Sequence, residues 1–209
     1  MTRTVVVDLG GVLLRWDPAT LIAGTWPDLA AGPQAVAELI AGVFQGGRPG
    51  ADWLEYDRGA LEPAALVERI RVRTGLPAGR LHELLDAIPG HLAVQPATAA
   101  LLDRLQAEGV RLVYLSNMPA RYADWLEGLP QFRRWFDGGV FSARVGHLKP
   151  EPQIYALAER RLGLVPERTL MLDDRADNVA AALRRGWSAA VFVDAASAAA
   201  DLTARGWLG

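Results

Sequence analysis

Four short runs along the chain are mostly apolar and show no alternation with polar positions. They span residues 5–9, 110–117, 168–174 and 189–193. Strands that are covered on both faces have this pattern, which is typical of parallel sheets. We therefore predict four strands of a buried parallel sheet.

Helical patterns separate these runs. Residues 96–109 carry apolar side chains on one face and stop at Gly109, and residues 151–163 start beside Pro152 and stop at Gly163. Residues 177–186 end in Arg-Arg-Gly, and the alanine-rich residues 194–204 predict a terminal helix. Glycine after a basic last turn is a common helix end. Alternating strands and helices predict a doubly wound, Rossmann-like α/β fold.

Residues 16–91 differ, because they contain no convincing strand pattern. Their apolar positions recur at helical spacing, and loop signals separate the stripes. The stripes comprise Val36, Ile40 and Val43, then Leu66 and Ile70, then Leu81, Leu84 and Leu85. We predict an α/β core of residues 1–15 and 93–209, with a helical cap of residues 16–92 inserted after the first strand.

Composition narrows the class of protein. The 209 residues suffice for one domain with an insertion. A formal net charge of −2 gives no basic excess, so we expect neither nucleic acid nor a membrane surface as a partner. The absence of cysteine excludes disulfides, thiol catalysis and zinc–thiolate sites. We expect a cytoplasmic protein, since Asp8 interrupts the N-terminal apolar run and argues against a signal peptide or membrane span. The oligomeric state stays open.

Polar residues gather where the predicted strands end. In an open parallel sheet, ligands bind at the carboxyl ends of the strands. Each polar residue alone fits a turn or a helix cap, although a charge at the end of a buried strand is costly without a partner. Together they place acids, a hydroxyl and a lysine at one sheet edge: Asp8, Ser116, Asn117, Lys149, Asp173, Asp174 and Asp177.

Acids that gather at one edge repel each other unless a cation lies among them. Oxygen ligands without histidine or cysteine favour a hard ion such as Mg²⁺. A hydroxyl, turn amides and an ammonium group beside that ion would form a phosphate site. A carboxylate in contact with both metal and phosphorus can act as a nucleophile.

The ordered segments "DLGGVLL", "YLSN", "KPEP" and "LDDRADN" resemble the four motifs of the haloacid dehalogenase superfamily, particularly its small sugar-phosphatase-like members. The resemblance covers the whole chain, including a helical cap after the first motif. It implies a Mg²⁺-dependent phosphatase that acts on a small phosphorylated metabolite, for example a sugar phosphate, through an aspartyl-phosphate intermediate.

The resemblance also implies a role for each matching residue. Asp8 would be the nucleophile, and Lys149 would neutralise charge on Asp8 and on the phosphoryl oxygens. Ser116 and Asn117 would hold the phosphate. The Mg²⁺ ligands would be Asp8, the backbone carbonyl of Gly10 and Asp173, with Asp174 or Asp177 supporting the metal and its waters.

Gly10 departs from the family pattern. The family's phosphatases usually carry a second aspartate at this position, which protonates the leaving oxygen and later activates water. The backbone carbonyl keeps its metal-binding role, but the acid is missing, and general acid–base catalysis is typically worth about 10²–10⁴-fold. His147 is a candidate substitute. Gly11 is expected to permit a tight turn around the phosphate.

The departure keeps two other functions open. A 2-haloacid dehalogenase would use the same nucleophile without the second acid, but it needs no metal and leaves the aspartate cluster without a purpose. A catalytically impaired phosphate-binding or interaction protein would explain Gly10 but not the retained nucleophile, lysine and acids.

Substrate contacts are expected from the predicted cap. Trp16 and Asp17 follow the first motif at the hinge, and Trp53, Tyr56 and Arg58 lie in "DWLEYDRGAL". These residues could line the cleft. The alternative is that the aromatic side chains form the core of the cap and that Arg58 is a surface charge.

Overall fold

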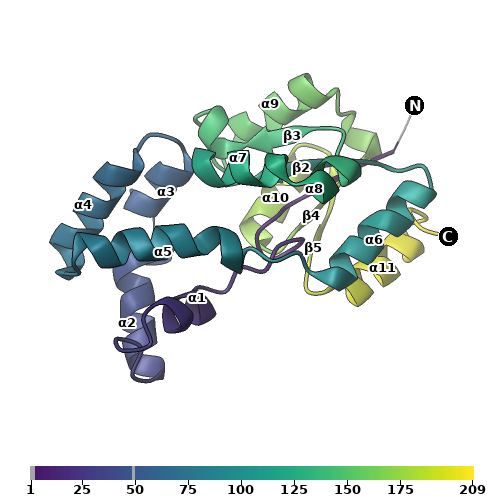
Figure 1. Ribbon diagram of the computed structural model, residues 1–209. Coiled ribbons are helices and arrows are strands. Elements are labelled where there is room, and N and C mark those ends of the chain that lie inside the picture. The colour runs from purple at the N-terminus through teal and green to yellow at the C-terminus, as the bar shows by residue number, and fades with distance from the viewer. Residues whose placement is uncertain (1–2, 49) are drawn as a thin grey trace.

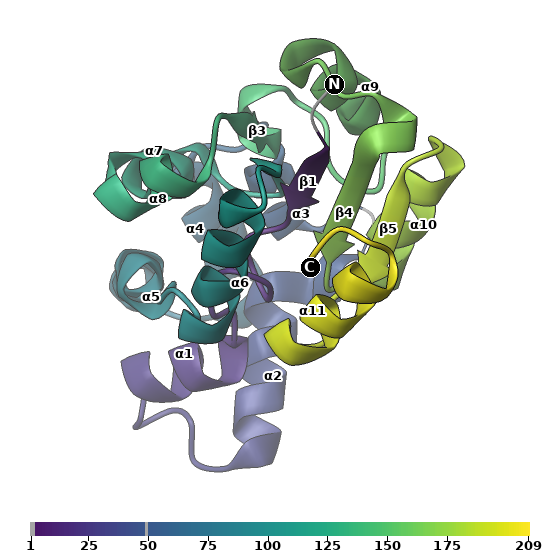
Figure 2. The same ribbon diagram turned by 90° about the vertical axis from the view of Figure 1, so that its right-hand side faces the viewer.

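The computed structural model describes residues 3–48 and 50–209. Five parallel strands form one sheet in the order β3-β2-β1-β4-β5 (Figures 1 and 2). The strands are β1 (Thr4–Val7), β2 (Arg111–Ser116), β3 (Gly139–Phe141), β4 (Thr169–Asp173) and β5 (Ser188–Val191). β1 therefore lies at the centre, with β2 and β4 as its neighbours.

Helices surround the sheet and extend to one side of it (Figure 1). The first group, between β1 and α6, is α1 (Pro18–Thr25), α2 (Pro33–Phe44), α3 (Asp52–Asp57), α4 (Pro63–Thr74) and α5 (Ala78–His91). The second group is α6 (Pro96–Ala107), α7 (Ala120–Gly128), α8 (Pro130–Trp135), α9 (Pro152–Leu162), α10 (Ala176–Arg184) and α11 (Ala195–Ala204).

Alternate residues of each strand face two different apolar layers. Val5 and Val7 pack into one cluster with residues of α6, α8 and α11. Val6 packs into the other cluster with residues of α9 and α10 (Figure 2). Because successive side chains of a strand point to opposite faces, both faces of β1 are buried. The predicted doubly wound α/β fold is confirmed.

The predicted strands are present, but one strand escaped prediction. β3 has three residues at the edge of the sheet, which is too short for a hydrophobic pattern to emerge. A Cβ at Gly139 would lie 2.3 Å from the ring of Tyr114 on β2, so only glycine fits beside that ring. At the opposite edge β5 ends at Val191, and Val193 is exposed beyond it.

The first group of helices, residues 18–91, forms what we call the helical unit. It is joined to the sheet by two chain segments that pair with each other. The N–H of Arg15 donates to the carbonyl of Ala93 at 2.9 Å, and that of Gln95 donates to the carbonyl of Leu13 at 2.8 Å. The division into a core of residues 1–15 and 93–209 and a cap of residues 16–92 stays a prediction. Within the unit, the predicted stripes of α4 and α5 are buried, whereas Val43 alone of the α2 stripe is fully buried.

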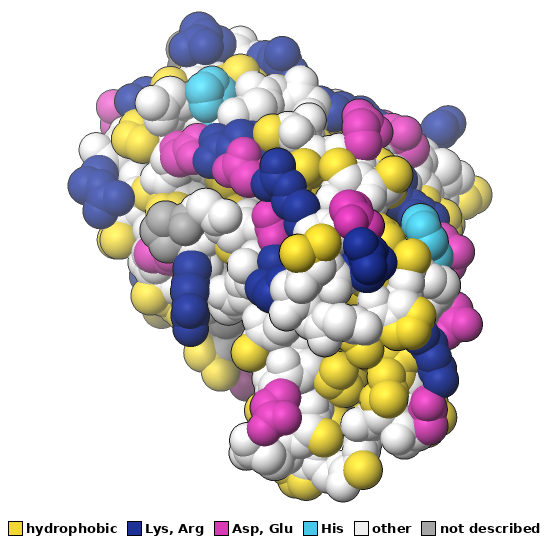
Figure 3. All heavy atoms as spheres, turned by 90° about the vertical axis from the view of Figure 1, so that its left-hand side faces the viewer, with side chains coloured by type: hydrophobic (Ala, Val, Ile, Leu, Met, Phe, Trp, Pro, Cys, Tyr) yellow, Lys and Arg dark blue, Asp and Glu magenta, His cyan; other side chains and the backbone are white. Residues whose placement is uncertain are grey.

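Charged side chains of both signs are interspersed on the face formed by the helical unit (Figure 3). Exposed ion pairs within the helical unit include Arg71 with Glu68 and Arg80 with Asp28. Exposed pairs of this kind contribute little to stability, at most about 1 kcal/mol each.

Within the described ranges 3–48 and 50–209, no helix combines the length and the apolar character that crossing a bilayer requires.

The helical unit approaches the core closely at Gly59, two residues after α3 ends. A Cβ at this position would lie 2.5 Å from the carbonyl oxygen of Ala143, and Gly59 has a φ of +78°. Both observations require glycine, because a side chain would meet backbone and would occupy the left-handed region.

We predict that Gly59→Ala lowers the free energy of unfolding by at least about 1–2 kcal/mol, the cost of the left-handed conformation alone. Gly79→Ala is the matched control, because Gly79 is exposed in α5 and a Cβ added there would meet no atom within 4 Å. It should leave the free energy of unfolding unchanged or raise it by up to about 1 kcal/mol, because alanine favours a helix more than glycine does. Urea denaturation measures both, and equal stability of the two variants would contradict the prediction.

Candidate active site

Two aspartates lie side by side because their strands are neighbours in register. Val7 of β1 pairs with Leu172 of β4. Asp8 and Asp173 are the next residues along the two strands, and the N–H of Asp8 continues the ladder by donating to the carbonyl of Leu172 at 2.9 Å. The parallel sheet therefore places both carboxylates at its carboxyl edge.

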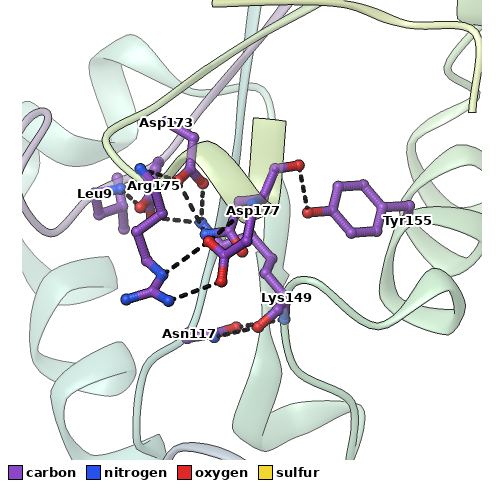
Figure 4. A network of polar contacts seen from close by, with 9 residues as sticks. Leu9, Asn117, Lys149, Tyr155, Asp173, Arg175 and Asp177 are labelled. Atoms are coloured by element: carbon purple, nitrogen blue, oxygen red, sulfur yellow. Dashed lines mark hydrogen bonds and ion pairs between the residues drawn. The ribbon is translucent and has the colours of Figure 1, made fainter. Parts of the chain in front are cut away.

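Lys149 joins the two carboxylates. Its Nζ lies 2.8 Å from Oδ1 of Asp8 and 2.7 Å from Oδ2 of Asp173 (Figure 4). Lys149, Asp8 and Asp173 are 4%, 7% and 0% exposed. An ammonium group between two carboxylates offsets much of the free-energy cost of burying these charges, because each charge has a partner of opposite sign.

Further donors fix the orientation of both carboxylates. Leu9 N–H donates to Oδ1 of Asp8 at 2.7 Å. Oδ1 of Asp173 accepts from Arg175 N–H and from Nδ2 of Asn178, each at 2.9 Å. The carbonyl of Asn178 in turn accepts from the hydroxyl of Tyr155 at 3.0 Å (Figure 4). Sequence reasoning missed Asn178, although it lies within the segment "LDDRADN".

The side chain of Asn117 holds the backbone of Lys149. Its Nδ2 donates to the Lys149 carbonyl at 3.0 Å, and its Oδ1 accepts from the Lys149 N–H at 2.8 Å. Ser116, the last residue of β2, is 1% exposed. Ser116 and Asn117 therefore lie at the carboxyl edge of the sheet. The side-chain amide of Asn117 holds the backbone of Lys149.

A third acid completes a group that could hold a metal ion. Asp8, Asp173 and Asp174 each offer a carboxylate oxygen, and these atoms lie within 4.8 Å of one another. An all-oxygen donor set fits a hard cation such as Mg²⁺. Gly11 permits this arrangement, because its φ is +78° and a Cβ there would lie 2.5 Å from Oδ2 of Asp174.

Asp177 lies outside this group. Its carboxylate forms a two-point contact with the guanidinium of Arg175, at 3.1 and 2.7 Å, on the exposed first turn of α10. Between the two acids considered for support of the metal, the structure places Asp174 with Asp8 and Asp173.

Burial and neighbouring charge shift the pKa values of the cluster. Burial raises the pKa of Asp8 to about 7, although Lys149 opposes this shift. Burial would lower the pKa of Lys149, but the charges of Asp8 and Asp173 outweigh that effect and raise it. Burial and the charge of Asp173 raise the pKa of the Asp174 carboxyl. The three carboxyl groups repel one another when they are ionised, and a bound cation would offset that repulsion.

The aromatic residues that were expected at a substrate cleft pack against one another. Trp16 and Trp53 both contact the ring of Phe44 edge-on, with centroids 5.6 and 4.6 Å away. Tyr56 continues this series, 5.7 Å from Trp53. Trp53 and Tyr56 are 8% and 4% exposed, so both belong to the apolar core of the protein.

The polar candidates have partners within the chain. Asp17 caps α1, where its side chain accepts from the N–H groups of Ala19 and Thr20. Arg58 contacts Glu151 on the sheet side of the molecule, at 2.6 and 3.0 Å. His147 is half-exposed, with Nδ1 3.6 Å from the same glutamate.

Fold and site together define an α/β enzyme with a buried carboxylate–lysine–carboxylate cluster at the carboxyl edge of its sheet. The sequence profile of the haloacid dehalogenase-like hydrolases matches residues 2–186. The chain therefore belongs to the haloacid dehalogenase-like hydrolase family.

Curated relatives include phosphatases. A sesquiterpene phosphatase of Aspergillus oryzae is 26% identical over 180 residues, which cover 86% of this chain and 84% of the relative. A phosphorylated carbohydrates phosphatase of Thermotoga maritima is 29% identical over 187 residues, covering 88% and 82%.

Solved structures share the fold. A HAD-family enzyme from Bacteroides thetaiotaomicron has a TM-score of 0.70 at 22% identity, and the match covers 91% of this chain and 93% of that enzyme. The same enzyme has also been solved as a magnesium complex, with a TM-score of 0.67.

We predict that Lys149→Met lowers the free energy of unfolding by about 3 kcal/mol, because it leaves two buried carboxylates without their counter-ion. Loss of the lysine removes the positive charge that lowers the Asp8 pKa, so that pKa rises above about 7. Above pH 7 the Asp8 carboxyl of the folded variant keeps a proton that the folded wild-type protein has released. The difference in the free energy of unfolding between the two proteins therefore grows as the pH rises above 7.

Chemical denaturation without divalent cations at pH 6 and pH 8.5 measures this difference. Arg134→Met is the control, because its ion pair with Asp103 is exposed. A Lys149→Met cost that is small or constant with pH would contradict the charge arrangement described for the cluster.

Proposed function

We propose that this protein is a Mg²⁺-dependent phosphatase of a small phosphorylated metabolite, with Asp8 as the nucleophile. The observation that carries the proposal is the buried Asp8–Lys149–Asp173 cluster, with Asp174 beside it at the sheet edge. Phosphatases among the curated relatives support the reaction class.

Asp8, Asp173 and the backbone carbonyl of Gly10 would hold Mg²⁺, with Asp174 in support. When bound, the ion supplies positive charge against the phosphoryl oxygens and against the clustered acids. The oxygen-only donor set supports this assignment, and so does the magnesium complex of the Bacteroides enzyme with the same fold.

The chain's own residues account for the covalent steps. A carboxylate oxygen of Asp8 attacks phosphorus, the bond from phosphorus to the ester oxygen breaks, and that oxygen leaves with the bonding electrons. A water molecule then attacks the aspartyl-phosphate, which releases inorganic phosphate and restores the carboxylate. The Leu9 N–H and Lys149 hold Oδ1 of Asp8, so the nucleophile approaches in a fixed orientation.

Lys149 and Ser116 would contact the transferred group. The ammonium group would offset charge on the phosphoryl oxygens, and the Ser116 hydroxyl would donate to one of them. Asn117 would contribute indirectly, because its two hydrogen bonds hold the backbone of Lys149.

The acid cluster favours this reaction over dehalogenation. A 2-haloacid dehalogenase would use Asp8 without a metal. The close group of carboxylates from Asp8, Asp173 and Asp174 would then have no role in the reaction. An impaired phosphate-binding protein would not need the buried nucleophile and lysine. Phosphate release measured with and without Mg²⁺ separates the three functions.

We predict that Asp8→Asn abolishes turnover while the fold is retained, because the amide keeps the shape but cannot attack phosphorus. Asp177→Asn is the matched control, and it should retain activity within a few-fold, since the Asp177 carboxylate is paired with Arg175. Wild-type activity should disappear in excess chelator and return with Mg²⁺.

Trapping with beryllium fluoride and Mg²⁺ should place the fluoride adduct on Asp8, as a structure or fluorine NMR would show. Turnover by the Asn variant at the wild-type rate would exclude Asp8 as the nucleophile. Full activity in chelator would exclude the metal and leave the nucleophile assignment standing.

The glycine at position 10 leads to a prediction about leaving groups. Without an acid there, the departing oxygen carries more negative charge, so good leaving groups should react faster. We expect kcat/KM to rise steeply with leaving-group acidity, and a sugar 1-phosphate to be preferred over its 6-phosphate. Loss of the whole acid effect amounts to about 3–5 kcal/mol.

Gly10→Asp provides the complementary test. A Cβ at Gly10 would meet only the Cβ of Trp16, at 3.8 Å, and the backbone of Gly10 lies outside the left-handed region. The position therefore has room for a Cβ, and the variant should gain most on poor leaving groups. A flat wild-type series, with chemistry shown to limit the rate, would mean that another acid acts, and His147→Gln would be the next variant.

A further inference from the structure

Three consecutive residues of the helical unit contact the sheet side of the molecule. The carbonyl of Asp57 accepts from the hydroxyl of Ser142, whose oxygen also accepts from the N–H of Met118 at 2.8 Å. Arg58 contacts Glu151, and Gly59 lies against Ala143. We call residues 57–59 the DRG segment. It contacts Ser142, which also binds the N–H of Met118, and it contacts the loop that carries Lys149.

Arg58 holds the Lys149 loop, residues 145–151, at two points. Its Nη1 donates to the carbonyl of Gly146 at 3.2 Å and to Oε2 of Glu151 at 3.0 Å, and its Nη2 donates to Oε1 of Glu151 at 2.6 Å. Lys149 lies between these two contacts in the sequence. The backbone of Arg58 is itself fixed, because its N–H closes α3 on the carbonyl of Leu54.

The contact has the geometry of a strong ion pair. Two parallel N–H···O bonds from one guanidinium to one carboxylate are directional, and lysine cannot reproduce them. The side chains of Arg58 and Glu151 are 27% and 33% exposed, so water screens the pair less than a fully exposed one. Glu151 also accepts from the Leu148 N–H at 3.1 Å, which ties its carboxylate to the residue before Lys149.

The Lys149 loop is therefore anchored from two sides. Asn117 holds the Lys149 backbone from the core, and Arg58 holds Gly146 and Glu151 from the helical unit. Arg58 is far from Lys149 in sequence and approaches it only through this loop. The geometry is that of a positioning residue, because the guanidinium contacts both ends of the loop that carries Lys149.

We propose that Arg58 is a positioning residue, through which the helical unit holds Lys149 in place between Asp8 and Asp173. The catalytic part of the proposal rests on the proposed phosphatase function. The structural part does not, because the burial of Lys149 can be measured without any substrate.

The chain offers a direct measurement. Lys149 is the only lysine in the sequence, since the other basic side chains among the 22 Lys and Arg residues are arginines. An amine-acylating reagent therefore modifies Lys149 and the amino terminus alone. In the folded protein Lys149 is 4% exposed and its labelling requires local opening, so the labelling rate reports how often the loop releases it.

We expect Arg58→Met to increase the rate of Lys149 acetylation by N-hydroxysuccinimidyl acetate at least about tenfold, equivalent to about 1.4 kcal/mol of opening free energy. Glu151→Gln should increase it in the same direction by less, because the amide oxygen still accepts. Peptide mass spectrometry reads the rate, with the amino terminus as the internal reference for the reagent.

Asp86→Asn is the matched control for Glu151→Gln. The Asp86 carboxylate also pairs across the seam between the helical unit and the core, with Arg121 at 2.8 Å, but neither residue belongs to the Lys149 loop. Its labelling rate and activity should stay within about twofold of wild type. A general loosening of the seam would raise labelling in this control as well.

Turnover supplies the second measurement. A mobile Lys149 fails to offset charge in the transition state, and small displacements of a reacting group are costly. We expect Arg58→Met to lower kcat about tenfold or more while KM changes less than about threefold. Arg58→Lys should restore part of kcat, since it returns the charge without the two-point contact.

Each outcome decides the proposal. Faster labelling with reduced kcat in Arg58→Met and Glu151→Gln, but not in Asp86→Asn, supports it. Labelling of the Arg58 and Glu151 variants at the rate of the control overturns it. If Arg58→Met does not fold, Glu151→Gln decides by the same measurement. If the wild-type protein hydrolyses no phosphate ester, faster labelling still establishes the loop contact, and the phosphatase proposal alone fails.

Discussion

The ammonium group of Lys149 between the carboxylates of Asp8 and Asp173 is the interaction on which the site depends. Burying three charges is costly unless each is paired and hydrogen-bonded. The surrounding structure meets that condition: strand register aligns the two acids, backbone N–H groups and Asn178 orient them, and Asn117 holds the lysine backbone. The pKa of Asp8 is still raised to about 7, because burial outweighs the nearby ammonium.

The same requirement explains how the helical unit and the core are joined. A buried charged side chain must be held in place by its surroundings. The loop that carries Lys149 contains no strand or helix across residues 145–151, so other segments must hold it. Contacts from Asn117 on one side and from Arg58 on the other supply that support. Gly59 allows the backbone of the helical unit to approach the core closely enough for the Arg58 contact.

Family membership and the residues of the site both indicate a hydrolase. The chain departs from the family pattern at position 10, which is glycine instead of aspartate. The chain matches the family over residues 2–186, and Asp8, Asp173 and Asp174 form a group that could hold a metal ion. Gly10 has room for a Cβ, so close contact with a neighbouring atom does not require glycine there. The physical consequence falls on the leaving oxygen, because nothing at this position can supply a proton to it.

The sequence by itself determined four of the five strands, the helices that alternate with them and the edge at which the acids meet. Apolar runs and helical stripes are local patterns, and parallel strands share one carboxyl edge, so Asp8, Asp173 and Lys149 could be assigned together. Only the tertiary structure decided that Asp174 joins the group while Asp177 pairs with Arg175, that Asn178 supports Asp173, and that Arg58 binds Glu151. The direction of a side chain and the identity of its partner depend on packing between segments as far apart as residues 58 and 151, which no local pattern encodes.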